Sequence, residues 1–143
     1  MDSIKTLYTG GTFDLFHAGH VNFLKHCKTL SEKVVVALNT DDFVKRYKGA
    51  TPIVSYEERK IILLSCRYVD AVIENTNGED SKPTILNVNP HIIAIGDDWA
   101  KKDYYKQMNF TQEWLDENEI LLVYIPYKQG ISSTELKKRI SSL

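Results

Sequence analysis

The sequence predicts an α/β fold, a Rossmann-like, doubly wound parallel sheet of five strands with helices on both faces. Short apolar runs alternate along the chain with segments of helical periodicity, which is the β-α-β-α order of a parallel sheet. The runs are rich in β-branched residues, as are strands buried on both faces. The 143 residues fit one domain, residues 1–143, with no internal repeat and no low-complexity tract.

Each predicted strand is short and mostly apolar. The five strands are Ile4–Thr9, Val34–Leu38, Ala71–Glu74, Ile92–Ile95 and Leu121–Ile125.

Helical patterns lie between these strands and after the last one. Ser55 and Ser132 each stand three residues before a glutamate, which is the capping-box signature of a helix start. The longest predicted loops are Asn39–Val54 and Asn75–Lys82. The predicted helices are His20–Leu30, one from Ser55 through Leu64, a weaker one over Lys82–Val88, one over Thr111–Asn118 and a last one from Ser132 through Ile140.

The composition is that of an ordinary soluble globular protein, with 43% hydrophobic and 26% charged residues. The formal net charge of -1 gives no long-range attraction to nucleic acid or to an anionic membrane. No apolar run approaches the roughly 20 residues of a membrane helix, and the first residues lack a signal-peptide core. Cys27 and Cys66 are expected as buried small residues in a reducing compartment. We therefore expect a cytoplasmic protein that neither binds nucleic acid nor inserts into a membrane.

The segment from Gly10 to His20 carries the strongest functional signal. The first predicted strand runs into Gly10 and Gly11, a short turn presents His17 and His20, and a helix begins at His20. Such a turn forms an anion site, because free backbone N–H groups and the positive end of the helix dipole point at one spot. Histidines there can donate to phosphate oxygens, more strongly when protonated. No cysteine or acidic cluster accompanies them, so no metal site is predicted. Asp14 is predicted either as a turn or helix-cap carboxylate or as a direct ligand.

Gly96, Asp97, Asp98 and Trp99 directly follow a predicted strand. The glycine lets a ligand approach the backbone, and paired carboxylates can hold Mg²⁺ or accept a hydrogen bond from a base amino group. A solvated acidic turn is the alternative.

The segment before the last predicted helix offers a glycine, hydroxyl groups and the N–H groups of a helix start, which together make a second anion cradle. A plain helix cap is the alternative. Its residues are Gly130, Ile131, Ser132, Ser133 and Thr134, preceded by Lys128.

Together these motifs resemble those of the HxGH nucleotidyltransferase superfamily, and most closely those of its glycerol-3-phosphate cytidylyltransferase group. The pattern G-T-F-D-x-x-H-x-G-H is matched by Gly11, Thr12, Phe13, Asp14, His17, Gly19 and His20. The segment Gly96–Trp99 is similar to the one near the base pocket of that group, which favours CTP. The chain departs from the family's R-T-E-G-I-S-T-T, because Tyr127 stands where the arginine is expected. Lys128 follows it and is the candidate to supply the charge.

Two arginines lie in further segments that resemble family motifs. Arg59 belongs to an S-Y-E-x-R-K pattern and Arg67 to an R-Y-V-D-x-V-I pattern. The resemblance places Arg67 near the nucleotide or near a contact between subunits, whereas Arg59 can equally pair with a carboxylate. In the group Lys45, Arg46 and Lys48, the resemblance favours Lys48 as the lysine that closes on a triphosphate.

The resemblance implies transfer of CMP from CTP to a phosphate monoester, glycerol 3-phosphate in the first place, with release of pyrophosphate. His17, His20 and Lys48 would be the catalytic residues, Mg²⁺ would bridge the CTP phosphates, and the protein would be a homodimer. Lys101–Asn118 is the candidate stretch for acceptor specificity. The residues implied in nucleotide binding are Gly10, Gly11, Thr12, Phe13, Asp14, Gly19, Arg67, Gly96, Asp97, Asp98, Trp99, Lys128, Gly130, Ile131, Ser132, Ser133 and Thr134.

Three alternatives stay open at this point. The acceptor could be phosphocholine, phosphoethanolamine or a sugar phosphate. The enzyme could be an ATP-dependent adenylyltransferase of the heptose-phosphate type. A nucleotide-binding subunit without turnover is the non-enzymatic alternative.

Overall fold

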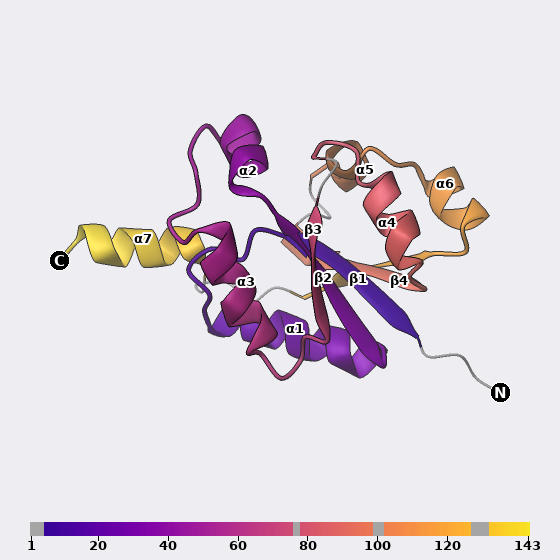
Figure 1. Cartoon of the computed structure of the whole chain (residues 1–143), viewed down its shortest axis with the longest axis horizontal. Coiled ribbons are helices and arrows are strands. Elements are labelled where there is room, and N and C mark those ends of the chain that lie inside the picture. The colour runs from indigo at the N-terminus through magenta and orange to yellow at the C-terminus, as the bar shows by residue number, and fades with distance from the viewer. Residues whose placement is uncertain (1–4, 76–77, 99–101, 127–131) are drawn as a thin grey trace.

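A computed structural model describes residues 5–75, 78–98, 102–126 and 132–143. Within these residues, five parallel strands form one sheet in the order β3-β2-β1-β4-β5 (Figure 1). The predicted parallel sheet is therefore confirmed. The strands are β1 (Thr6–Gly11), β2 (Lys33–Asn39), β3 (Ala71–Asn75), β4 (Ile92–Gly96) and β5 (Leu121–Ile125).

The first strand lies further along the chain than predicted. β1 extends through Gly10 and Gly11, which pair with Ala37 and Leu38 of β2. The continuous ladder with β2 offsets the weak strand preference of glycine. The turn that leaves the sheet therefore begins only at Thr12.

Helices cover both faces of the sheet, as the sequence predicts. One face carries α1 and α3, packed around Leu24 and Leu63, and the other carries α4, α5 and α6, packed around Ile85, Met108 and Leu115. The helices are α1 (Ala18–Leu30), α2 (Asp41–Lys48), α3 (Tyr56–Leu64), α4 (Lys82–Val88), α5 (Tyr104–Met108), α6 (Gln112–Glu117) and α7 (Ser133–Ser141).

The predicted loop Asn39–Val54 is wrong in part, because it contains α2. Thr40 caps this helix by accepting from the Phe43 N–H at 3.1 Å, and Gly49 ends it in the left-handed conformation with φ 82°. Only two of its eight residues are buried. Thr40 before the helix and Gly49 after it are start and end signals that could have located it in the sequence. The five-residue helix α5 is likewise absent from the predicted elements.

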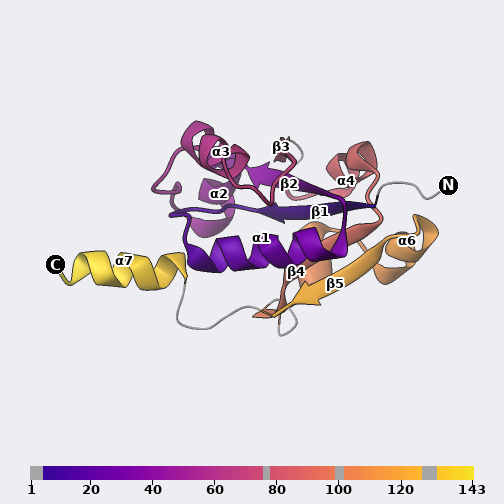
Figure 2. The same cartoon turned by 90° about the horizontal axis from the view of Figure 1, so that it is seen from below.

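Both predicted serine caps are present. Ser55 accepts from the Glu58 N–H at 3.4 Å, and Ser132 accepts from the Glu135 N–H at 3.0 Å. The helix that Ser132 begins, α7, buries no residue and projects away from the sheet (Figure 2). Among the residues that the structure describes, no helix is long and apolar enough to cross a membrane.

Candidate active site

The strand order reverses between β1 and β4. In open α/β sheets, ligands bind at such a switch point, outside the carboxyl ends of the strands. β1 and β4 pair only through Leu7 with Ile92 and Tyr8 with Ile93, and they separate beyond these residues. The turn after β1 and the residues after β4 therefore flank the point where the two strands separate.

His17 and His20 are both held by the backbone at the start of α1. The Nδ1 of His17 accepts from the Gly19 N–H at 3.0 Å, and the Nδ1 of His20 accepts from the His17 N–H at 3.1 Å. Because a backbone N–H can only donate, each neutral ring carries its proton on Nε2. The Nε2 of His17 is buried and has no hydrogen-bond partner among the described residues. The turn therefore presents the His17 Nε2–H as a fixed donor that no described residue accepts from.

Burial keeps both histidine rings neutral. It lowers the pKa of His17. The pKa of His20 falls to about 3, mainly through burial and also through the neighbouring His17, against an opposing effect of Asp14. The two rings stack with 3.8 Å between their centroids. The free site thus holds neutral donors rather than the protonated rings that would donate more strongly, and a bound phosphate would raise both pKa values.

The turn between β1 and α1 has an uncommon backbone conformation. Phe13 has φ 52° and Leu15 has φ 49°, left-handed values that are rare for residues other than glycine. A Cβ on Gly11 would lie 2.8 Å from the Phe13 ring, so any other residue here would clash with the ring in its present position. Backbone strain of this kind is concentrated at functional sites.

Asp14 binds the backbone of a second loop. Its carboxylate accepts from the N–H groups of Leu15 at 3.0 Å, Ile53 at 2.8 Å and Val54 at 2.9 Å. The residue is 8% exposed. Since both of its oxygens are engaged, the structure favours the turn role over the ligand role that the sequence left open.

The start of α7 lies beside the same turn. The Ser133 hydroxyl donates to the carbonyl oxygen of Asp14. Ser132 is occupied as the cap of α7, and Thr134 is exposed. The two helix starts that the sequence predicted as anion cradles, those of α1 and α7, are thus brought together.

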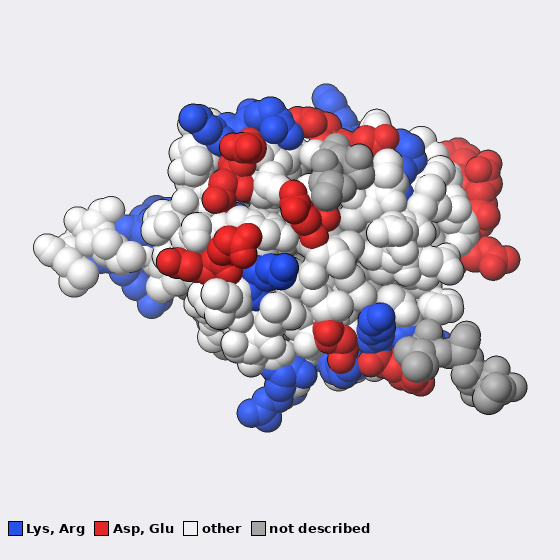
Figure 3. All heavy atoms as spheres, in the orientation of Figure 1, with Lys and Arg blue, Asp and Glu red and all other residues white. Residues whose placement is uncertain are grey.

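Lys48 lies exposed in the last turn of α2, with its Nζ 5.6 Å from the centre of the Tyr47 ring. The Tyr47 hydroxyl shares a 3.3 Å hydrogen bond with the Thr12 hydroxyl, so this end of α2 lies against the turn after β1. Arg46 is engaged by Glu79 at 3.2 Å. Basic side chains gather over α2 in Figure 3.

Gly96 ends β4, and Asp97 and Asp98 follow it as exposed residues on the β4 side of the switch point. Several predicted site residues lie outside the described residues. They are Trp99, Lys128, Gly130 and Ile131, together with Tyr127.

Arg67 lies at the other edge of the sheet. It is exposed in the turn between α3 and β3, at the amino end of the strands, whereas the turn after β1 lies at their carboxyl ends. Asp70, in the same segment, accepts from the Lys28 Nζ and the Val34 N–H, both at 2.8 Å. The fold therefore separates Arg67 from the turn after β1 of its own chain, and its role near a subunit contact remains a proposal.

Three buried polar residues near the turn were not predicted as site residues. The Tyr8 hydroxyl and the Thr9 hydroxyl have no hydrogen-bond partner among the described residues. A Cβ on Gly10 would lie 3.6 Å from the Tyr8 hydroxyl, so this group lies directly against β1 where it leaves the pairing with β4. Arg59 is 1% exposed. Its family-like pattern pointed to the residue, but no local signal could report its burial.

Seven residues between Asp103 and Trp114, within the predicted specificity stretch Lys101–Asn118, line a cavity of about 500 Å³ together with Lys82. Lys106 and Trp114 are among the lining residues. The cavity belongs to the helices on the face opposite α1. None of its lining residues belongs to the turn that holds His17.

Comparison with known proteins decides the family. A family model described as cytidylyltransferase-like matches residues 8–139. The chain belongs to the cytidylyltransferase-like family. It is 41% identical to the glycerol-3-phosphate cytidylyltransferase of Bacillus subtilis (strain 168), over 98% of this chain and 100% of that protein.

Two further relatives extend this picture. The cytidylyltransferase-like chain is 42% identical to the FAD synthase of Pyrococcus abyssi, over 94% of this chain and 90% of that protein. Its structure matches that of the lipopolysaccharide core biosynthesis protein from Thermoplasma volcanium with a TM-score of 0.70 and 27% identity, over 88% of this chain and 98% of that one. The chain is therefore a nucleotidyltransferase, as its motifs implied.

Proposed function

We propose that this cytidylyltransferase-like chain transfers CMP from CTP to a phosphate monoester, glycerol 3-phosphate in the first place, and releases pyrophosphate. The observation that carries the proposal is the buried, unpartnered Nε2 of His17, held at the start of α1 beside the switch point. A fixed N–H donor at a helix start suits a phosphate oxygen. The full-length similarity to a glycerol-3-phosphate cytidylyltransferase supports both CTP and the acceptor.

The proposed reaction is an in-line displacement at the α-phosphorus of CTP. An oxygen of the acceptor phosphate forms the new P–O bond, and the bond from the α-phosphorus to its bridging oxygen breaks, so pyrophosphate leaves with that electron pair. The acceptor oxygen is already anionic and needs no general base. His17 and His20 would donate to the phosphate oxygens as charge builds, and Lys48 would neutralise the leaving pyrophosphate.

Mg²⁺ fits this site as a companion of the nucleotide. Both oxygens of Asp14 are engaged by backbone N–H groups, and Asp41 is paired with Arg59. The exposed Asp97 and Asp98, directly after β4, are therefore the carboxylates that would help to hold it. Among the described residues, no three His, Cys, Asp or Glu side chains form a metal-binding group. Phosphate oxygens and water would therefore supply most ligands, and the bound ion would neutralise phosphate charge.

The test is pyrophosphate release with Mg²⁺, crossing CTP and ATP against a panel of phosphate monoesters. We expect turnover with CTP and glycerol 3-phosphate. Preference for ATP would contradict the proposed nucleotide, and the similarity to an FAD synthase makes that comparison necessary. Turnover with CTP and only phosphocholine, phosphoethanolamine or a sugar phosphate would contradict the proposed acceptor while keeping the chemistry.

We also propose that the protein is a homodimer. The outer side of α3 exposes Ile61 (64%) and Leu64 (52%), in the helix that leads to Arg67. A second copy covering these side chains would remove apolar surface from water. Light scattering at micromolar concentration should give twice the monomer mass, and a monomer mass would contradict the proposal.

A further inference from the structure

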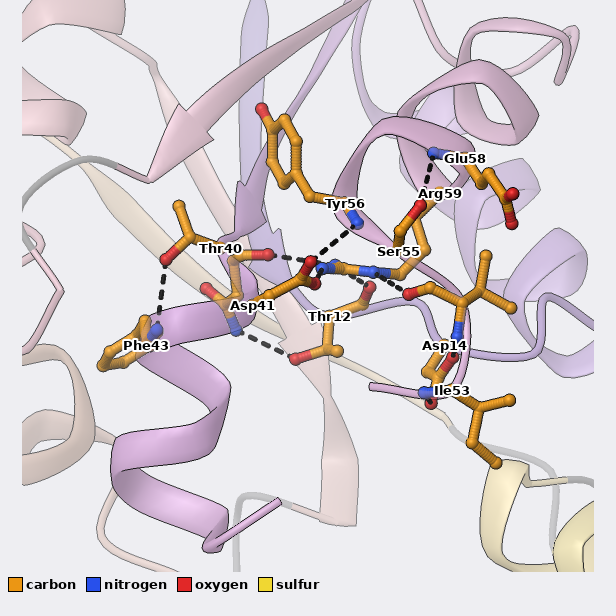
Figure 4. Close-up of polar contacts among 12 residues, drawn as sticks. Thr12, Asp14, Thr40, Asp41, Phe43, Ile53, Ser55, Tyr56, Glu58 and Arg59 are labelled. Atoms are coloured by element: carbon orange, nitrogen blue, oxygen red, sulfur yellow. Dashed lines mark hydrogen bonds and ion pairs between the residues drawn. The ribbon is translucent and has the colours of Figure 1, made fainter. Parts of the chain in front are cut away.

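Arg59 is a buried cation directly behind the turn after β1, where it contacts Thr12. Its side chain is fully buried, and its partner Asp41 is 38% exposed. The two groups lie 2.6 Å apart, and Figure 4 shows the guanidinium between Asp41 and Thr12. A buried charge is costly unless its donors are satisfied by hydrogen bonds.

The guanidinium joins three segments that are distant in sequence. Nη1 donates to the carbonyl oxygens of Thr12 at 2.8 Å and Asn39 at 2.9 Å. Nε donates to the carbonyl oxygen of Val54 at 2.9 Å, and Nη2 donates to Asp41. One side chain thus holds the turn after β1, the start of α2 and the loop before α3.

The bond to Thr12 also orients the next amide. In a trans peptide the C=O and the following N–H point in opposite directions. Because Arg59 holds the Thr12 carbonyl on its own side, the Phe13 N–H faces away from Arg59. No described residue accepts from this N–H.

The same arrangement sets the place of α2. Asp41, its first residue, also accepts from the Tyr56 N–H at 3.3 Å. The Asn39 amide donates to the Thr12 hydroxyl at 3.1 Å, and at the far end of the helix Tyr47 contacts the same hydroxyl. Lys48 is the neighbour of Tyr47, so the position of its stem depends on this set of contacts.

We propose that Arg59 is a positioning residue for the phosphates of the nucleotide: it fixes the Thr12–Phe13 peptide and the start of α2 together, so that the Phe13 N–H and the basic end of α2 face one phosphate chain. This proposal rests on the proposed function for the identity of the nucleotide. Arg59 itself does not touch the substrate. Lysine cannot replace it, because an ammonium lacks the planar fork that reaches several carbonyls at once.

The experiment compares ligands with and without phosphates. Calorimetry on the full chain measures binding of MgCTP, of cytidine and of inorganic tripolyphosphate to wild type, Arg59→Lys and Asp41→Asn. Thermal unfolding checks that each variant is folded. Arg139→Met is the matched control, since it removes an arginine and its 3.8 Å ion pair with Glu135 from the surface of α7.

We expect Arg59→Lys to weaken MgCTP and tripolyphosphate binding at least about tenfold and cytidine binding less than about twofold. Asp41→Asn should weaken MgCTP binding at least about threefold, and it decides the question if Arg59→Lys does not fold. Arg139→Met should bind all three ligands like wild type. Equal weakening of cytidine and MgCTP would show a merely structural role and overturn the proposal, as would unchanged MgCTP binding.

Failure of the proposed function gives a different result. If tripolyphosphate binds in an Arg59-dependent way but CTP gives no pyrophosphate with any acceptor, the positioning role stands and the proposed function falls. If wild type turns over CTP while Arg59→Lys binds every phosphate ligand normally, the proposed function stands and the positioning role falls. Absence of phosphate binding in the wild type would overturn both.

Discussion

The backbone N–H of His17 donates to the Nδ1 of His20 at 3.1 Å, so the two histidines cap α1 and fix each other at the same time. The cap decides which ring nitrogen carries the proton. Each Nε2–H is therefore set before any ligand arrives. Donors that need no reorganisation are the most effective in stabilising developing charge.

Replacing His17 with alanine should remove most of the activity and leave the fold intact. We expect turnover to fall by about 10²- to 10³-fold. The lost helix cap should lower the free energy of unfolding by about 1 kcal/mol. His26→Ala, which changes an exposed histidine of the same helix, is the control and should turn over like wild type. Wild-type turnover of the His17 variant would contradict the assigned role.

The depressed pKa of His20 predicts a loss of stability in mild acid. The unfolded chain binds a proton near pH 6.5, and the folded chain binds it only near a pKa of about 3. The contribution of His20 to the free energy of unfolding is therefore fully present above pH 6.5, and it is lost as the pH falls from 6.5 towards 3. We expect His20 to account for a decrease of about 2 kcal/mol between pH 7.5 and pH 5. Urea unfolding at the two pH values measures it, and His20→Asn should show a smaller decrease. An equal decrease in both proteins would argue against a buried neutral ring.

Asp14 should matter for the loop before α3. Asp14→Asn puts an amide N–H₂ where a carboxylate oxygen now accepts from backbone N–H groups. We expect a loss of about 2 kcal/mol in unfolding free energy and faster amide exchange at Ile53 and Val54. Asp42→Asn, an exposed change in the first turn of α2, should cost less than about 0.5 kcal/mol. Unchanged exchange at the two amides would mean that Asp14 does not hold this loop.

The attachment of α7 can be tested through Ser133. Ser133→Ala removes the hydroxyl that donates to Asp14, and we expect MgCTP binding to weaken about threefold to tenfold. Stability should change little, because α7 buries no residue. Ser141→Ala is the control, since that hydroxyl bonds within α7 to the Lys137 carbonyl at 2.9 Å. Equal MgCTP affinity in the two variants would mean that the start of α7 is not part of the nucleotide site.

The sequence by itself determined the alternation of strands and helices, the caps at Ser55 and Ser132, and the turn with His17 and His20. These features depend on neighbours within a few residues, where periodicity and capping chemistry are visible in the chain. The family resemblance rested on the same local motifs. At Gly10 and Gly11 the weak strand preference of glycine competed with the hydrogen-bonded ladder to β2, and the sequence therefore predicted the end of β1 too early.

Only the tertiary structure decided the burial of Arg59, the bonds of Asp14 to Ile53 and Val54, and the separation of Arg67 from the turn after β1. The contact of Arg59 with Thr12 spans 47 positions, and that of Asp14 with Val54 spans 40. Contacts of such range depend on strand order and on which edge of the sheet each loop leaves. No periodicity or cap in one segment records them, because they form only when the β1 turn, the start of α2 and the loop before α3 meet at the carboxyl ends of the strands.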